Sequence, residues 1–80
     1  MIPLTKMESG TSGVIAEIQG GHRMLSRLDS LDIRPGRKIR KISQQALRGP
    51  VVVEVNRAQV AVGFGMASQI MIDIIEDQDA

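Results

Sequence analysis

The sequence contains no cysteine, no tryptophan and no tyrosine, and its single aromatic residue is a phenylalanine. Without cysteine the chain has no disulfide framework and offers a metal no thiolate ligand. With Phe64 as the only aromatic residue, it is poorly equipped to stack on single-stranded bases. We therefore expect no specific nucleic acid partner, although unspecific contacts to a duplex backbone stay open.

Long apolar runs are also missing. The longest nearly unbroken run, from Val60 to Ala67, is far shorter than the roughly 18 apolar residues that suggest a membrane-spanning helix. The opening MIPLTK does not have the basic and then apolar pattern of a secretory signal. These absences predict a cytoplasmic protein that crosses no bilayer.

Histidine occurs only once, as His22. A hydrolytic triad needs a histidine that faces a nucleophile and is oriented by an acid, and one histidine alone does not supply that arrangement. Tight transition-metal sites use clustered His, Cys and carboxylates, and the chain has neither H-x-x-x-H nor C-x-x-C spacing. We therefore expect no catalytic residue, no metal ligand and no cofactor, and hence no enzyme.

What the sequence does have is an uneven distribution of charge. Ten basic and nine acidic residues nearly balance over the 80 residues and give a net charge of +1. Basic residues nevertheless dominate between residues 21 and 60, whereas residues 76–80, EDQDA, are acidic and have little to bury. The prediction is one domain over residues 1–75, followed by an acidic tail at residues 76–80 that frays.

Periodicity predicts five strands and one principal helix. The strands are expected at residues 13–18, 37–42, 50–55, 59–64 and 70–75. Met24, Leu25, Leu28 and Leu31 form one stripe of a helix from about His22 to Leu31, which must end near Asp32 because Pro35 disfavours helical geometry at the residue before it. Residues 65–69 leave room for one further helical turn. Such short strands favour a mainly β fold, a small five-stranded barrel, because closure removes exposed sheet edges.

Alternation within the strands predicts which side chains face the core. Val51, Val53 and Val55 are expected to point inward, and Val60, Val62 and Phe64 to share one face. The third strand is irregular, since Ile39 and Ile42 are three residues apart and strict alternation places them on opposite faces. A bulge in the strand, or its end near Lys41, is needed to reconcile them.

The order of several segments resembles the FeoA family of small SH3-like barrels. The segments are LTKMESGTSGVIAEI, a GG followed by a helix ending in Leu-x-x-Leu, LDIRPG, GPVVVEV and VAVGFGMASQIMI, which together run from about Pro3 to Ile74. The family commonly has Gly at the position of Asp32, and Asp is one of the few other residues that tolerate a positive φ. The turn that precedes Pro35 therefore remains compatible with this sequence.

The resemblance implies an SH3-like barrel and a role in iron homeostasis. Proteins of this family are cytosolic accessories of ferrous iron uptake that bind a FeoB-type GTP-binding membrane transporter. This chain is accordingly expected to bind and modulate such a transporter through protein–protein contacts, at the inner face of the membrane. A similar domain ends the metal-dependent repressors of the DtxR type, so a stand-alone regulatory or sensing module is the alternative.

The basic stretch after the helix is the candidate partner-binding surface. Its positive field would speed encounter with an acidic protein surface or an anionic membrane leaflet, with Arg48 expected nearby. A solvated strand face that only blunts a sheet edge is the competing explanation. Apolar residues beside the stretch are the second candidate surface. The full set of candidate residues is Leu31, Ile33, Arg34, Arg37, Lys38, Arg40 and Lys41.

Overall fold

The computed structural model describes residues 1–75 as a single antiparallel sheet with two helices and a 3-10 turn. The strands are β1 (Ile2–Pro3), β2 (Ser12–Ile18), β3 (Lys38–Gln44), β4 (Val51–Val55), β5 (Ala58–Val62) and β6 (Ile70–Ile74), and the helical elements are η1 (Leu4–Lys6), α1 (His22–Asp29) and α2 (Phe64–Ala67). The predicted acidic tail at residues 76–80 lies outside the described residues. None of the helices in residues 1–75 has the length and apolar character to cross a membrane.

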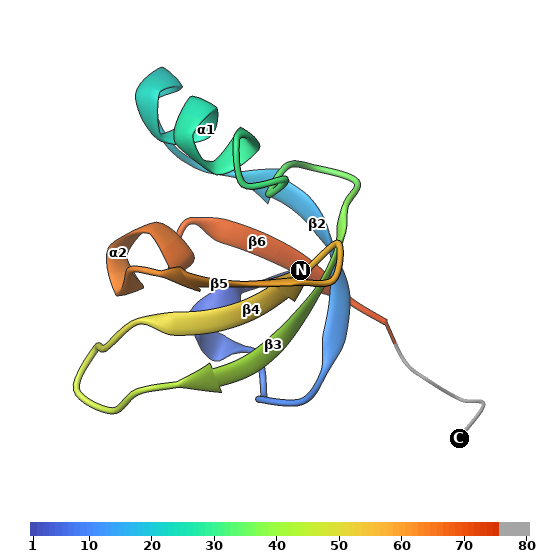
Figure 1. Cartoon of the computed structure of the whole chain (residues 1–80), viewed down its shortest axis with the longest axis vertical. Helices are drawn as coiled ribbons and strands as arrows, with labels where there is room; N and C mark the ends of the chain where they lie inside the picture. Colours follow the sequence, from blue (N-terminus) through green and yellow to red (C-terminus); the bar gives the residue numbers. More distant parts are fainter. Residues whose placement is uncertain (76–80) are drawn as a thin grey trace.

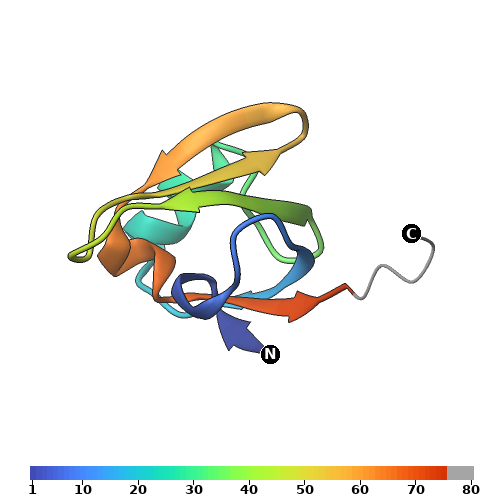
Figure 2. The same cartoon turned by 90° about the horizontal axis from the view of Figure 1, so that it is seen from below.

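The sheet bends on itself into a small barrel, with strand order β1-β6-β2-β3-β4-β5. The strands β3, β4 and β5 form one layer and β6 with β1 the other, while α1 lies outside the sheet (Figures 1 and 2). The mainly β fold is thus confirmed, but the count of five strands is wrong. The missing strand is β1, which pairs Ile2 with Ile72 and is too short to show a two-residue period.

The core lies between the two layers of the sheet and under α1. Val51, Val53 and Val55 are buried, as their alternation predicts, and they pack with the buried residues of β6, Ile70 and Ile72. The central residue of the α1 stripe is also buried, since Leu28 has no exposed surface. Met24 is partly buried and packs against the core, whereas Leu25 and Leu31 are 36% and 41% exposed, so the stripe anchors the helix through Leu28 and Met24.

Two sequence-based boundaries need correction, and one open alternative is decided. Helix α1 ends at Asp29, and two turn residues follow before Asp32. Strand β5 ends at Val62, and Phe64 begins α2, so Phe64 does not continue the strand face; the predicted extra helical turn is confirmed as α2. The irregularity in β3 is a bulge, because the register with β4 shifts between Lys41 and Ser43. This outcome is one of the two that the spacing of Ile39 and Ile42 allowed.

Non-glycine residues with positive backbone φ angles lie in three turns of the barrel. Asp32 has a φ of 68°, as expected for the residue that replaces the family glycine. Asn56 and Arg57, at 53° and 68°, form the β4–β5 turn. Leu47 and Arg48, at 61° and 62°, lie in the β3–β4 loop, where the Leu47 side chain is 98% exposed. Non-glycine residues seldom adopt this conformation, so each turn stores some backbone strain.

Candidate functional site

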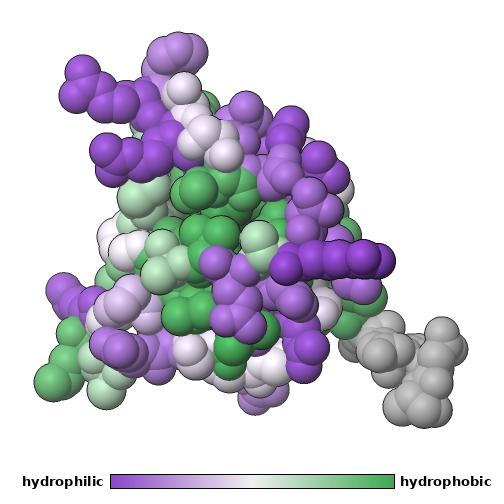
Figure 3. All heavy atoms as spheres, in the orientation of Figure 1, coloured by the Kyte–Doolittle hydropathy of each residue, from purple (hydrophilic) through white to green (hydrophobic). Residues whose placement is uncertain are grey.

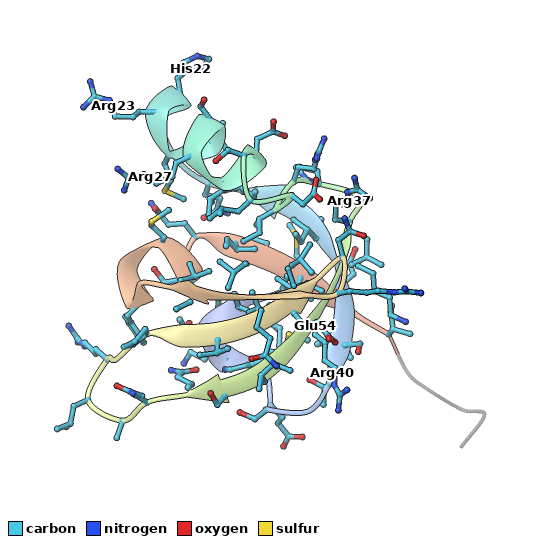
Figure 4. All side chains as sticks on the ribbon, in the orientation of Figure 1. His22, Arg23, Arg27, Arg37, Arg40 and Glu54 are labelled. Carbon is cyan, nitrogen blue, oxygen red and sulfur yellow. The ribbon has the colours of Figure 1, made fainter. Side chains whose placement is uncertain are left out.

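Four cationic side chains surround one depression on the outer surface of the barrel. Lys38 and Arg40 come from β3, Arg37 precedes that strand, and Arg57 comes from the β4–β5 turn. We call these four residues the basic face. Glu54 of β4 lies directly opposite Arg40 in the sheet register and is the one acidic residue among the described residues that line the depression. Figure 4 shows Arg37, Arg40 and Glu54 on the same side of the molecule, at the right of the view.

Most of the basic face is free of internal partners. Within residues 1–75, Lys38, Arg40 and Arg57 make no ion pair, and all three are exposed. Arg37 is only loosely held, since its guanidinium Nη2 lies 3.4 Å from Asp32 Oδ1 and its side chain is 46% exposed. Exposed charges without partners contribute little to folding. Their concentration around one depression instead provides a positive field for an anionic partner.

Asp32 fixes the geometry of one wall of this depression. Its carboxylate accepts hydrogen bonds from Arg34 and Arg37, and from Asn56 Nδ2 at 3.1 Å. The Arg34 guanidinium, followed by the Asn56 amide, lowers the pKa of the Asp32 carboxyl below its ordinary value. Asp32 thereby joins the segment that leads into β3 to the β4–β5 turn, and so holds Arg37 and Arg57 on one side of the barrel.

Lys41 was expected on the exposed basic surface, and this is wrong. It is 2% exposed, and Lys41 Nζ donates hydrogen bonds to the carbonyl oxygens of Met7 at 2.6 Å and Leu4 at 3.1 Å. It also donates to Gln44 Oε1, and the Thr5 carbonyl oxygen lies 3.4 Å away. Burial lowers the pKa of the ammonium. Lys41 therefore fastens the N-terminal turn to β3.

The other candidate residues divide into exposed and internal ones. Ile33 has no exposed surface, so its assignment to a docking surface is also contradicted, whereas Leu31 is 41% exposed in the turn after α1. Arg34 is 42% exposed but is held by acidic neighbours, because it pairs with Asp32 and its Nε lies 3.4 Å from Asp29 Oδ1. Of the basic candidates, Lys38 and Arg40 are exposed and make no ion pair within residues 1–75, and Arg37 is only loosely paired.

Sequence reasoning missed Arg57 as a member of the basic face. Arg57 is 17 residues from Arg40 along the chain, and the β4–β5 turn brings it to the same depression. The expected neighbour Arg48 is elsewhere, with its guanidinium carbon 5.9 Å from the centre of the Phe64 ring. One sequence signal could have indicated Arg57. It lies in the turn NRAQ, directly after the strand β4 that pairs with β3.

A second pair of arginines lies on α1. Arg23 and Arg27 are one helical turn apart and rim an apolar groove with Met24 and Met66. Figure 4 shows them on the opposite side of the molecule from Arg37 and Arg40. Apolar side chains are visible on the surface below α1 in Figure 3. Arg23 and Arg27 can therefore serve as a control for two cations of the basic face, because they carry the same charge at a different place on the surface.

Comparisons with known proteins identify the family of the chain. A family model described as the FeoA domain matches residues 2–74. The chain belongs to the FeoA family. A FeoA relative from Methanocaldococcus jannaschii, named putative Fe(2+) transport protein A, is 32% identical over 76 residues, which cover 95% of this chain and 90% of that protein. FeoA domains are small SH3-like domains and are not a known enzyme family.

Solved structures confirm the SH3-like fold. A crystal structure of an iron uptake regulatory protein, also a FeoA, matches with a TM-score of 0.83 and 30% identity, over 92% of this chain and 96% of that one. A manganese-dependent transcriptional repressor matches with a TM-score of 0.84 and 23% identity. The match covers 91% of this chain but only 41% of the repressor, and it shows a shared fold alone.

Proposed function

We propose that this FeoA protein is a cytoplasmic accessory of ferrous iron uptake that binds and modulates a FeoB-type GTP-binding transporter. Membership of the FeoA family and the name of the Methanocaldococcus jannaschii relative support the link to iron transport. The observation that carries the proposal of docking is the basic face, where three exposed cations without ion pairs in residues 1–75 border one depression. A surface of this kind suits an acidic patch on the cytosolic part of a transporter.

Electrostatic attraction gives this docking its expected properties. Complementary charges raise the rate of encounter, and their effect falls as salt shortens the screening length from about 10 Å at 0.1 M. The anionic inner leaflet beside the transporter would attract the same surface. Binding is therefore expected to be salt-sensitive and to bring the protein to the inner face of the membrane.

Charge reversal on the basic face tests the proposal. The double variant Lys38→Glu and Arg40→Glu changes two exposed side chains and leaves Lys41 and the core intact. It should weaken co-purification with the transporter and reduce ferrous uptake, most strongly at low salt. The matched control is Arg23→Glu with Arg27→Glu, which makes the same change of charge on α1. If the two double variants bind equally well, the basic face is not the docking surface.

The alternative function is a stand-alone regulatory or sensing module. The specific observation in its favour is the fold match to the manganese-dependent repressor, whose chain is more than twice as long as the matched region. A module of this kind would associate with a DNA-binding repressor and not with a membrane transporter. Binding of the purified protein to a repressor that lacks its own SH3-like domain, without binding to the transporter, would favour this alternative.

A further inference from the structure

The described chain ends one strand away from the basic face. The backbone N–H of Ile75 donates a hydrogen bond to the carbonyl oxygen of Ser12 at 3.0 Å, and Ser12 lies directly opposite Arg40 in the β2–β3 register. Adjacent strands are about 4.8 Å apart, so the backbones of Ile75 and Arg40 are separated by about 10 Å. Ser12 itself lines the depression that Arg40 borders.

The sequence that follows this point is acidic. Glu76, Asp77 and Asp79 occur within four residues, directly after the last residue that contacts Ser12. An extended chain spans about 3.3–3.6 Å per residue, so residues 76–79 reach about 13 Å beyond Ile75. That length is sufficient to bring carboxylates to Arg40 and to the neighbouring Lys38.

We propose that residues 76–79 are an intramolecular occupant of the basic face, where they compete with acidic partners. This proposal rests on the proposed function in so far as the same face docks a transporter. The charges are complementary, because three carboxylates follow Ile75 and three exposed cations of the face have no ion pair within residues 1–75. The acidic segment thus acts as a tethered competitor that a true partner must displace.

The expected strength of this competition is modest. Each exposed ion pair contributes only about 0–1 kcal/mol, but a short tether gives the segment an effective concentration in the millimolar range. Neutralising the three carboxylates should therefore raise the affinity for an acidic ligand by about two- to tenfold at low salt. Screening should remove most of this difference at high salt.

Nuclear magnetic resonance on the full chain tests the contact without any partner. The triple variant Glu76→Gln, Asp77→Asn and Asp79→Asn should shift the side-chain Nε–Hε signals of Arg40 and Arg57 at low salt, and the shifts should disappear at high salt. The signals of Arg23 and Arg27 on α1 serve as the internal control. Unchanged signals for Arg40 and Arg57, or equal shifts for all four arginines, would overturn the proposal.

A hexaglutamate peptide provides the competition assay. Its affinity should rise about two- to tenfold in the triple variant relative to the parent protein, and the rise should be absent when Lys38→Glu and Arg40→Glu are also present. Equal affinity of the parent and the triple variant would contradict the proposal. The transporter assay is independent of these results. Absence of the arginine shifts refutes only the contact of residues 76–79 with the basic face. Transporter binding that is unchanged by Lys38→Glu and Arg40→Glu refutes only the proposed function.

Discussion

Lys41 Nζ donates a hydrogen bond to the carbonyl oxygen of Met7 at 2.6 Å, and the two residues are 34 positions apart in the sequence. The same ammonium reaches the carbonyl oxygen of Leu4, so one side chain of β3 holds both ends of the N-terminal turn. This buried cation makes no ion pair within residues 1–75, and its hydrogen-bond acceptors are neutral oxygens.

Lys41→Met should therefore destabilise the fold. Methionine fills a similar volume, but it removes the Lys41 donor from the carbonyl oxygen of Met7, and a buried acceptor left unpaired costs about 1–3 kcal/mol. The carbonyl oxygen of Leu4 loses one of its two donors and keeps the backbone N–H of Met7. We expect the free energy of unfolding to fall by at least about 1 kcal/mol in urea denaturation. Lys38→Met, the same substitution at an exposed position of β3, should change it by less than about 0.5 kcal/mol. Equal effects of the two variants would show that the Lys41 contacts do not stabilise the turn.

Leu28→Ala tests the packing of α1. Leu28 is fully buried, and truncation of a buried leucine to alanine typically costs about 2–5 kcal/mol. Leu31→Ala, at a residue that is 41% exposed in the turn after the helix, should cost clearly less. Chemical denaturation of the two variants provides the comparison. A Leu28→Ala variant as stable as the parent would mean that α1 does not depend on this contact.

Asp32→Asn should remove part of the acid sensitivity of the fold. The pKa of the folded carboxyl lies below 3.8, mainly because Arg34 binds the carboxylate, so the stabilising contribution is present above that pH and is lost as the pH falls through the folded pKa. Asparagine tolerates the positive φ but carries no charge. The variant should therefore be less stable than the parent at pH 6, and the difference should shrink well below pH 3.8. Denaturation midpoints at the two pH values measure this, with Asp73→Asn as the exposed control.

Arg57→Gly separates stability from binding. Arg57 has a φ of 68° in the β4–β5 turn, where glycine adopts the left-handed region without steric cost. We expect the variant to be more stable by about 1 kcal/mol in urea denaturation, because the left-handed conformation costs other residues about 1–2 kcal/mol. It also removes one cation of the basic face, so salt-dependent docking should weaken at the same time. A loss of stability would show that Arg57 makes a contact that outweighs its strain.

The sequence predicted those parts of the fold that depend on local patterns. The alternating valines of β4 were identified correctly as buried, because the pattern reflects one face of one strand, whereas of the helix stripe only Leu28 is fully buried and Leu25 and Leu31 are exposed. The strand β1 was missed, since a pair of residues has no period and is defined by its pairing with β6. The spacing of Ile39 and Ile42, which no regular strand accommodates, allowed either a bulge in β3 or its end near Lys41, and the register shift shows the bulge.

The site was predicted less well, because its residues are defined by contacts between distant segments. Alternation after the buried Ile39 places Lys41 on the inner face of β3, but a lysine is rarely buried without a partner, and its carbonyl partners lie in the N-terminal turn. Arg57 and Asp32 are likewise brought together with Arg37 by the β4–β5 turn. Prediction from residue type alone therefore placed the buried Lys41 on the surface and did not include Arg57 in the basic face.

The exposed tip of the β3–β4 loop offers a place for a spectroscopic label. Leu47 is 98% exposed and follows the C-terminal end of β3, whereas Lys38 and Arg40 lie at the beginning of that strand. Figure 1 shows this loop on the opposite side of the barrel from the end of β6. Because the sequence has no native cysteine, Leu47→Cys creates a single thiol for a fluorophore or spin label. Such a label would report the rotation and distance of the protein on a partner while leaving the cationic end of the barrel uncovered.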